Sequence, residues 1–314
     1  MLYKNLDNGK KGVYLRCEIR MKFMQAINVI SLFNGMGTLR KALHNLNVPV
    51  DKYYSSEIKP YANKLQQHHF LDVIQVGDIN NWKEWDIDWS TIDLIGSGSP
   101  CQDLSIAGKR AGLKGENSSL FWVFIDILNH VKKLNPNVKF LQENVGSAPK
   151  EAVRIMSEAL NILPVRINSN LVTAQNRDRY YWSSVKVRTD WTSFNWTDIE
   201  QPEDRKIYLR DIIESGEVET VKALCITERY GFATTYKDVF SEKAQRCYQK
   251  RNQAGFISVV KENDYLRLLT QTELERLQGF PDGYTSILSY NQAASVLGDG
   301  WTLPVIEHIL KQMQ

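Results

Sequence analysis

Short apolar runs alternate with amphipathic segments over the first half of the chain, and this alternation indicates the fold. The runs have the length of buried strands, and the segments between them have helical periodicity. The predicted strands are Ile27–Leu32, Tyr53–Ser56, Val73–Val76, Asp93–Gly96 and Val138–Gln142, and the predicted helices are Thr38–Leu46, Pro60–His69 and Ser118–Lys133. Strands that alternate with helices predict an α/β fold with a doubly wound, mostly parallel sheet.

The pattern changes after the apolar run Tyr180–Val185. Residues 188–266 have weak periodicity, scattered aromatic residues and mixed charge, which indicates a smaller second domain. Order returns at residue 267, where Thr270 and Glu273 have the spacing of a helix capping box, and Trp301–Gln312 is predicted as a final amphipathic helix. We therefore predict a large domain of residues 26–187 that residues 267–314 rejoin, and an N-terminal extension, residues 1–25, to which no function is assigned.

Composition and charge narrow the class of protein only a little. The chain has 314 residues, of which 43% are hydrophobic and 24% charged, as in ordinary globular proteins, and its formal charge is +3. A segment within residues 229–251 is more basic and fits phosphate contacts or a solvated surface equally well. Its basic residues are Arg229, Lys237, Lys243, Arg246, Lys250 and Arg251.

Four cysteines stand at Cys17, Cys101, Cys225 and Cys247, without Cys-x-x-Cys pairs or the spacing of a zinc site. No secretory signal is recognised, and no apolar run has the length of a membrane span. We therefore expect a cytoplasmic protein with reduced thiols, no metal and no membrane partner.

Candidate functional residues directly follow several predicted strands. They are Phe33–Gly37, Glu57, Asp78, Pro100–Gln102 and Glu143–Asn144. Ligands of parallel sheets bind at the carboxyl ends of the strands, so we expect these residues along one rim.

The first rim segment, Phe33–Gly37, is a glycine loop between a strand and a helix. Such a loop lets the backbone approach a ligand, and Glu57 after the next strand is placed to accept bonds from ribose hydroxyls. Arg40 occupies the position of the third glycine of the dinucleotide fingerprint, which favours a nucleoside cofactor without pyrophosphate. Asp78 could bind an adenine amino group. The alternative is a tight turn with surface acids. It is less favoured because the glycine loop, Glu57 and Asp78 each follow a successive predicted strand.

Three further features suggest chemistry. Cys101 follows a strand within a basic stretch that favours a thiolate, although a lone cysteine is more often inert. Glu143 follows the fifth strand and could act as a general acid, or simply cap a helix. Arg177 and Arg179 point to one side of an extended segment, where they could brace a base and a carboxylate or form a surface charge cluster.

Together, and in this order, the segments resemble the cytosine-C5 DNA methyltransferase family. The resemblance covers roughly Asn28–Ser184 and Arg267–Leu310. Its motifs are Phe33–Gly37, Glu57, Gly77-Asp78-Ile79, Pro100-Cys101-Gln102, Glu143-Asn144-Val145, Gln175-x-Arg177-x-Arg179, Arg267–Thr270 with Glu273, Arg276–Pro281 and Gly298–Trp301. Two positions depart from the family pattern: Asp299 stands where many members have Asn, and Asn34 where small residues are common.

The resemblance implies S-adenosylmethionine as the cofactor, without a metal. It assigns cofactor binding to Phe33, Gly35, Met36, Gly37, Glu57, Ile58, Asp78, Ile79, Pro100, Leu120, Asp299 and Trp301. It also implies a smaller domain, residues 188–266, that reads the sequence of double-stranded DNA. We expect the enzyme to act as a monomer; whether a restriction endonuclease accompanies it is left open.

The catalytic residues implied by the resemblance are Cys101, Glu143, Arg177 and Arg179. Cys101 attacks C6 of a cytosine flipped out of the duplex, Glu143 holds or protonates N3, and Arg179 braces the base with support from Arg177. The loop Asp103–Gly115 is predicted to close over the site.

Three other functions compete with this interpretation. Relatives that modify transfer RNA carry Cys-Phe-Thr in the insert, where this chain has Cys225-Ile226-Thr227, which disfavours RNA without excluding it. An inactive DNA-binding homologue would usually lack the nucleophile or the acid. A small-molecule methyltransferase would explain neither the long insert nor the Pro-Cys-Gln segment.

Overall fold

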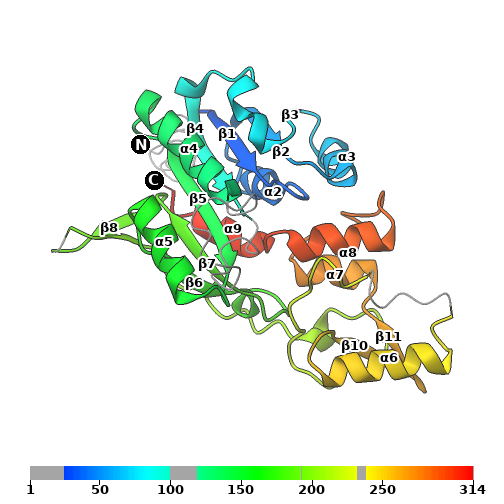
Figure 1. The fold of residues 1–314 in the computed structure, drawn as a ribbon. Coiled ribbons are helices and arrows are strands. Elements are labelled where there is room, and N and C mark those ends of the chain that lie inside the picture. Colours follow the sequence, from blue (N-terminus) through cyan, green and yellow to red (C-terminus); the bar gives the residue numbers. More distant parts are fainter. Residues whose placement is uncertain (1–24, 100–118, 192, 232–237, 314) are drawn as a thin grey trace, which may run out of the picture.

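A seven-stranded sheet forms the centre of the structure, a computed structural model that describes residues 25–99, 119–191, 193–231 and 238–313 (Figure 1). Its strand order is β3-β2-β1-β4-β5-β7-β6. The strands are β1 (Ile27–Leu32), β2 (Val50–Ser56), β3 (Val73–Gln75), β4 (Ile92–Ser97), β5 (Lys139–Val145), β6 (Val165–Asn168) and β7 (Asp178–Ser183). Neighbouring strands among β1 to β5 pair in parallel, which confirms the predicted doubly wound, mostly parallel sheet.

Helices cover both faces of this sheet because successive strand residues point to opposite sides. Val29 belongs to one buried hydrophobic cluster and Ile30 to the other. The first cluster includes residues of α2 (Thr38–Asn45), α3 (Pro60–His69) and α9 (Leu303–Leu310), and the second includes residues of α4 (Ser119–Leu134) and α5 (Lys150–Leu160). The 3-10 turns η1 (Ile79–Glu84) and η2 (Trp89–Thr91) lie against α4. Both faces of the sheet are therefore buried, and the loops emerge at the ends of its strands.

Strand β7 runs antiparallel to both of its neighbours. Its register places Arg179 opposite Val145 and Tyr181 opposite Glu143. Because β7 runs against β5, the first residues of β7 lie beside the last residues of β5. This reversal brings the predicted arginine pair to the same edge as the ends of the parallel strands.

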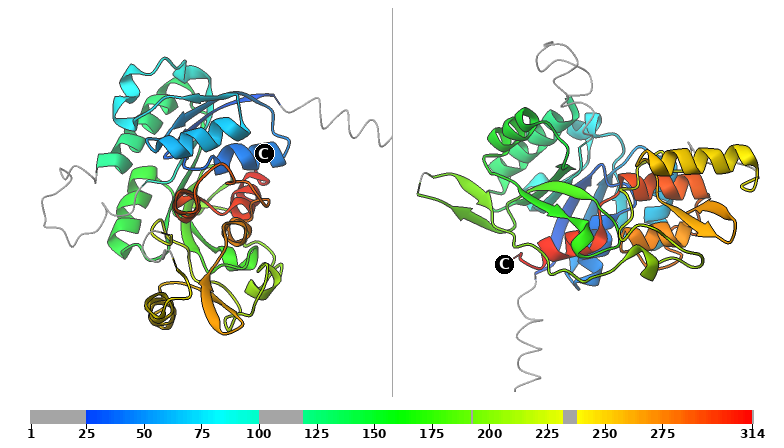
Figure 2. Two further views of the ribbon diagram at one scale, coloured as in Figure 1. Left: turned by 90° about the vertical axis from the view of Figure 1, so that its right-hand side faces the viewer. Right: turned by 90° about the horizontal axis from the view of Figure 1, so that it is seen from below.

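A small lobe beside the sheet contains α6 (Glu242–Gln253) and the hairpin of β10 (Val259–Glu262) and β11 (Tyr265–Leu268) (Figures 1 and 2). Further described elements are the turns η4 (Ser169–Leu171) and η5 (Leu209–Asp211) and the helices α7 (Gln271–Leu277) and α8 (Tyr290–Asp299), and α7 and α8 pack against each other beside the small lobe (Figure 1). Buried residues of the small lobe, such as Tyr230 and Tyr248, belong to the same hydrophobic cluster as α2 and α9. The lobe and the sheet domain thus share a core.

A second hairpin, of β8 (Val187–Thr189) and β9 (Asn195–Thr197), projects from the sheet domain on the side away from the small lobe (Figures 1 and 2). It is held to the sheet domain by a bridge between Leu163 and Trp196 and by a 3.0 Å bond from the Ser183 N–H to the Thr197 hydroxyl. The boundary predicted at residue 188 falls inside its first strand.

Several boundaries agree with the sequence predictions. Strand Ile27–Leu32 and helix Pro60–His69 have the predicted bounds. The capping box is confirmed, since the Thr270 hydroxyl accepts a 3.1 Å bond from the Glu273 N–H and Glu273 Oε2 accepts a 2.8 Å bond from the Thr270 N–H. Pro100–Gln102, the predicted lid Asp103–Gly115 and residues 1–24 lie outside the described residues. No helix in the described part of the chain is long and apolar enough to cross a membrane.

Candidate active site

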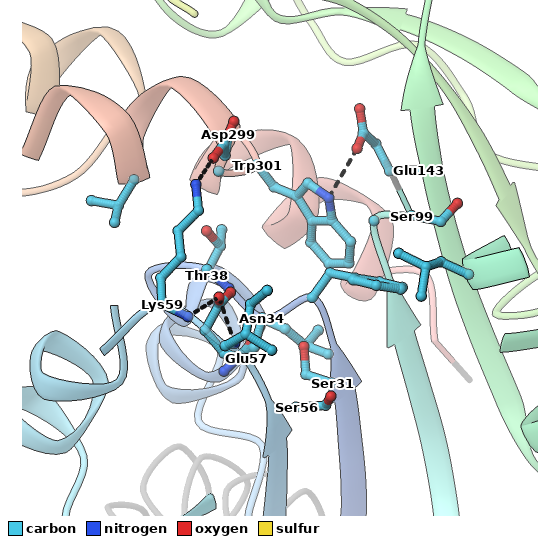
Figure 3. Close-up of a pocket in the computed structure, with 18 of the residues that line it drawn as sticks. Ser31, Asn34, Thr38, Ser56, Glu57, Lys59, Ser99, Glu143, Asp299 and Trp301 are labelled. Carbon is cyan, nitrogen blue, oxygen red and sulfur yellow. Dashed lines mark hydrogen bonds and ion pairs between the residues drawn. The ribbon is translucent and has the colours of Figure 1, made fainter. Parts of the chain in front are cut away.

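A cavity of about 470 Å³ opens at the carboxyl edge of the sheet (Figure 3). The predicted site residues that line it are Phe33, Gly35, Glu57, Ile58, Asp78, Ile79, Leu120, Glu143, Arg177, Arg179, Asp299 and Trp301. They come from the ends of β1, β2, β3 and β5, from the start of α4, from the segment at the start of β7, and from the end of α8 and the turn that follows it. The structure therefore brings the cofactor and acid motifs to one place.

Met36 and Gly37, also predicted to bind the cofactor, are not among the lining residues. Met36 is fully buried, its carbonyl accepts a 3.1 Å bond from the Tyr284 hydroxyl, and its side chain packs against Gly300. Gly37 caps α2 with φ +80°, a left-handed backbone conformation that favours glycine. These two residues shape the loop from beneath the cavity. Pro100 and Cys101 lie outside the described residues.

Glu57 ties the glycine loop to the end of β2. Its Oε2 accepts a 2.8 Å bond from the Gly35 N–H, and its Oε1 accepts bonds of 2.8 Å from the N–H groups of Ile58 and Lys59. A carboxylate has about four acceptor positions, so roughly one remains for a ligand hydroxyl. The side chain thus organises the loop and also borders the cavity (Figure 3).

Asn34, a departure from the family pattern, has internal partners. Its amide donates a 3.0 Å bond to the Ser55 hydroxyl, and its Oδ1 accepts a 3.0 Å bond from the Tyr53 hydroxyl. Buried Gln66 of α3 completes the network by donating a 2.6 Å bond to the Gly35 carbonyl. The polar side chain at position 34 therefore anchors the glycine loop to β2.

Asp78 caps the turn η1 at the far side of the glycine loop. Its Oδ1 accepts a 2.9 Å bond from the Asn80 N–H and a 3.0 Å bond from the Asn80 side-chain amide. The side chain is exposed and lines the cavity beside buried Ile79. An acid next to an apolar residue suits a base that has both an amino group and a flat face.

Glu143, on β5, is the acid at the centre of the site and is 8% exposed. Its Oε2 accepts a 3.1 Å bond from Trp301 Nε1 (Figure 3), and its Oε1 lies 2.8 Å from Arg179 Nε. The Arg179 contact is an ion pair whose N–H direction does not meet hydrogen-bond geometry. A side chain on Gly98 would place its Cβ 2.8 Å from Trp301 Nε1, so the absence of a Cβ there lets the indole reach the carboxylate.

The two predicted catalytic arginines differ in their partners. Arg177 is 4% exposed and donates to backbone carbonyls of three residues: Ile226 at 3.2 Å, Gly298 at 3.0 Å and Gly300 at 2.8 Å. It therefore joins the small lobe to the end of α8 and the residue that follows it. Arg179 instead faces Glu143 and donates a 2.9 Å bond to the Asp178 carbonyl.

Burial and neighbouring charges act in opposite ways on these arginines. Burial, assisted by the charge of Arg179, lowers the pKa of Arg177. Burial also disfavours the charged form of Arg179, but the Glu143 carboxylate together with Cys225 and Tyr181 outweighs it, and the pKa of Arg179 is raised. Both side chains remain guanidinium cations at neutral pH despite their burial.

Asp299, the second departure from the family pattern, forms an ion pair at the edge of the cavity. Lys59 Nζ lies 2.6 Å from Asp299 Oδ2 and 2.6 Å from Glu228 Oε1. Burial, with the nearby charge of Glu228, raises the pKa of Asp299 by more than Lys59 and Arg177 lower it. Burial opposes the charge on Lys59, but its bonds to Asp299 and Glu228 outweigh that effect and raise the pKa of Lys59.

Sequence reasoning missed four contributors to the site: Lys59, Gln66, Glu228 and the indole contact of Trp301 with Glu143. Lys59 and Asp299 are 240 residues apart, and Trp301 and Glu143 are 158 apart, so no local pattern signals these contacts. Within the part of the chain that the structure describes, no group of three or more His, Cys, Asp or Glu side chains is arranged to hold a metal ion.

Comparison with known proteins adds an independent line of evidence. The family described as C-5 cytosine-specific DNA methylase matches residues 27–241 and 226–314. The chain is 26% identical to the type II methyltransferase M.HpaII of Haemophilus parainfluenzae over 326 residues, covering 88% of this chain and 86% of the relative. It is 26% identical to M.HhaI of Haemophilus parahaemolyticus over 323 residues, covering 93% and 95% of the two chains.

Solved structures share the fold at lower identity. The methyltransferase EhMeth of Entamoeba histolytica matches with a TM-score of 0.60 and 16% identity, covering 92% of this chain and 98% of that one. A variant of DNMT2 from Spodoptera frugiperda matches with a TM-score of 0.58 and 19% identity, covering 92% and 99%. At these identities the likeness concerns the fold alone.

Proposed function

This chain belongs to the C-5 cytosine-specific DNA methylase family, and we propose that it transfers a methyl group from S-adenosylmethionine to C5 of cytosine in double-stranded DNA. As a member of this family the chain is an enzyme. One observation carries the finer proposal: buried Glu143 stands between Arg179 and Trp301 in the cavity that the Glu57-bound glycine loop also lines.

The cavity suits an adenosyl cofactor without phosphates. Glu57 retains roughly one acceptor position for a ribose hydroxyl, and Asp78 with Ile79 offers a carboxylate and an apolar contact for a base. A cavity of about 470 Å³ is within the size range of small-molecule sites. We propose that Phe33, Leu120 and Trp301, which also line the cavity, cover the apolar faces of the bound cofactor.

Cytosine C5 is a poor nucleophile, so the protein must activate the ring. We assign this step to Cys101, whose thiolate forms a bond to C6 and pushes an electron pair towards C5. When bound, S-adenosylmethionine supplies an electrophilic methyl group. C5 forms the new carbon–carbon bond as the sulfur–methyl bond breaks and S-adenosylhomocysteine is left. Loss of the C5 proton to water, followed by expulsion of the Cys101 thiolate, then restores the aromatic ring. Covalent catalysis of this kind replaces one difficult step by easier ones.

Glu143 and Arg179 act on the base while its charge changes. As Cys101 adds to C6, negative charge develops towards N3, where Glu143 donates or shares a proton. Arg179, 2.8 Å from the Glu143 carboxylate, braces that carboxylate and the base. Both groups are largely buried, so their interactions with the ring are stronger than in water.

Duplex DNA is the proposed substrate because the matching family is described as a DNA methylase family and the named relatives are type II methyltransferases. Lys243, Arg246 and Lys250 lie on the exposed side of α6 in the small lobe, at helical spacing. Side chains of this kind contact phosphates and position a duplex, and base contacts from the small lobe then select the sequence. The target cytosine leaves the stack at a cost of roughly a few kcal/mol.

The deciding experiment is bisulfite-type sequencing of DNA from a methylation-free bacterial host that expresses the chain, with a parallel assay of host RNA. We expect 5-methylcytosine at one short DNA sequence, and none in cells that express Cys101→Ala. Methylation confined to RNA would transfer the proposal to the RNA substrate. A Cys101→Ala enzyme that still methylates DNA would refute the covalent mechanism.

A further inference from the structure

Three distant parts of the chain meet at the ammonium group of Lys59. Lys59 caps α3, and its own N–H donates a 2.8 Å bond to Glu57 Oε1, so it belongs to the cofactor rim. Its Nζ lies 2.6 Å from Glu228 of the small lobe and 2.6 Å from Asp299 at the end of α8 (Figure 3 shows the Asp299 contact). All three side chains line the cavity.

The backbones behind the two acids are also in direct contact. A Cβ on Gly298 would lie 2.3 Å from the carbonyl carbon of Thr227 and 2.4 Å from the Glu228 nitrogen, so only glycine permits this packing. Arg177 bridges the same two segments through the carbonyls of Ile226 and Gly298. A shift of residues 226–228 therefore requires a shift of residues 298–300.

Charge makes the contact depend on Lys59. Two carboxylates share one ammonium, and their contacting oxygens, both bonded to the same nitrogen, are separated by roughly 5 Å or less, where like charges repel. Burial already raises the pKa of Asp299 while Lys59 is present, so the ionised carboxylate is poorly solvated there. Without Lys59, the two acids would repel each other, and the joined segments 226–228 and 298–300 would lose their link to the cofactor rim.

We propose that Lys59 is a positioning residue that couples occupancy of the cofactor cavity to the placement of the DNA-reading lobe, through its shared bridge to Asp299 and Glu228. The inference rests on the proposed function. A cofactor that orders Asp299 also orders Glu228 through Lys59, and the small lobe is then held in place for DNA. Such coupling is reciprocal, so bound DNA must raise the affinity for the cofactor by the same factor.

The test measures the Kd of S-adenosylhomocysteine by calorimetry, with and without a short unmethylated duplex that carries the sequence which the enzyme methylates. For the wild type we expect DNA to tighten binding by about fivefold or more, within the usual range of coupling. Lys59→Met should reduce this factor to below about twofold, and Lys59→Arg should restore most of it, because both carboxylates regain a cation. Lys64→Met, on the exposed side of the same helix, is the matched control and should retain the wild-type factor.

Each outcome is decisive. An unchanged factor in Lys59→Met, or a wild type whose affinity ignores DNA, overturns the coupling. A wild type that binds no S-adenosylhomocysteine at all contradicts the proposed function instead. If Lys59→Met does not fold, Glu228→Gln replaces it. This variant keeps the Lys59–Asp299 pair and removes the negative charge by which the small lobe contacts Lys59. It should also lower the factor, and an unchanged factor there would equally overturn the proposal.

Discussion

Replacement of Arg177 by methionine should mainly destabilise the protein rather than disable its chemistry. The guanidinium is 4% exposed and donates to the carbonyls of Ile226, Gly298 and Gly300. Methionine fills much of the same volume but donates no hydrogen bond. With three carbonyl partners at about 1 kcal/mol each, we expect the free energy of unfolding to fall by about 3 kcal/mol.

The measurement is urea unfolding of Arg177→Met beside Arg188→Met, an exposed arginine on β8 that serves as the control. At a temperature where the variant is folded, its turnover per folded molecule should stay within about tenfold of wild type. Arg179→Met should instead lose at least about a hundredfold in turnover, the usual cost of removing one group that stabilises developing charge. The reasoning is refuted if Arg177→Met unfolds within about 0.5 kcal/mol of the Arg188→Met control, the usual range for surface changes.

Three further measurements test other parts of the site and its surroundings. Trp301→Phe keeps the ring but removes the N–H that donates to Glu143, so kcat on DNA should fall about tenfold or more, while an unchanged kcat would remove the indole from the mechanism. Burial lowers the pKa of His69 below its usual value of 6.5, so the stability that the neutral imidazole contributes is complete above pH 6.5 and is lost as the pH falls below it. Urea unfolding of the wild type between pH 5 and about 8 should show this loss of unfolding free energy, and His69→Gln should lack it. The double variant Lys243→Gln/Lys250→Gln on α6 should weaken DNA binding without changing the preferred sequence. The slope of log Kd against log salt concentration should fall by up to about two, and an unchanged slope would show that α6 does not contact the duplex.

The strand-end residues of the site could be predicted from sequence because their placement follows from local pattern and one topological rule. Glu57 and Glu143 each directly follow a predicted strand, and parallel strands carry such residues to one edge of the sheet. Helix α3 was predicted with its observed bounds because proline marks its first turn. The elements of the small lobe could not be predicted, since their apolar residues join a core shared with α2 and α9 and have little periodicity of their own.

The antiparallel direction of β7 was also beyond the sequence pattern, and it changes what the arginine motif means. An alternating segment predicts that Arg177 and Arg179 share a side, and both do line the cavity. Their partners, however, lie on β5, in the small lobe and at the end of α8, which only the assembled fold brings together. One motif therefore contributes a residue that faces the acid and a residue that joins the lobes.

Other residues of the site also combine a place in the cavity with a structural contact, so a loss of activity alone does not tell which of the two roles was removed. Glu57 lines the cavity but accepts three bonds from backbone N–H groups, one of them in the glycine loop, and Asp299 lines the cavity while paired to Lys59. A substitution at any of these positions would lower activity whether it removes a ligand contact or loosens the edge of the cavity. Binding of S-adenosylhomocysteine separates the two effects, since a lost contact weakens binding by a constant factor with or without DNA. A loosened edge instead changes the dependence of cofactor binding on DNA, because only the connection between the lobes has been altered.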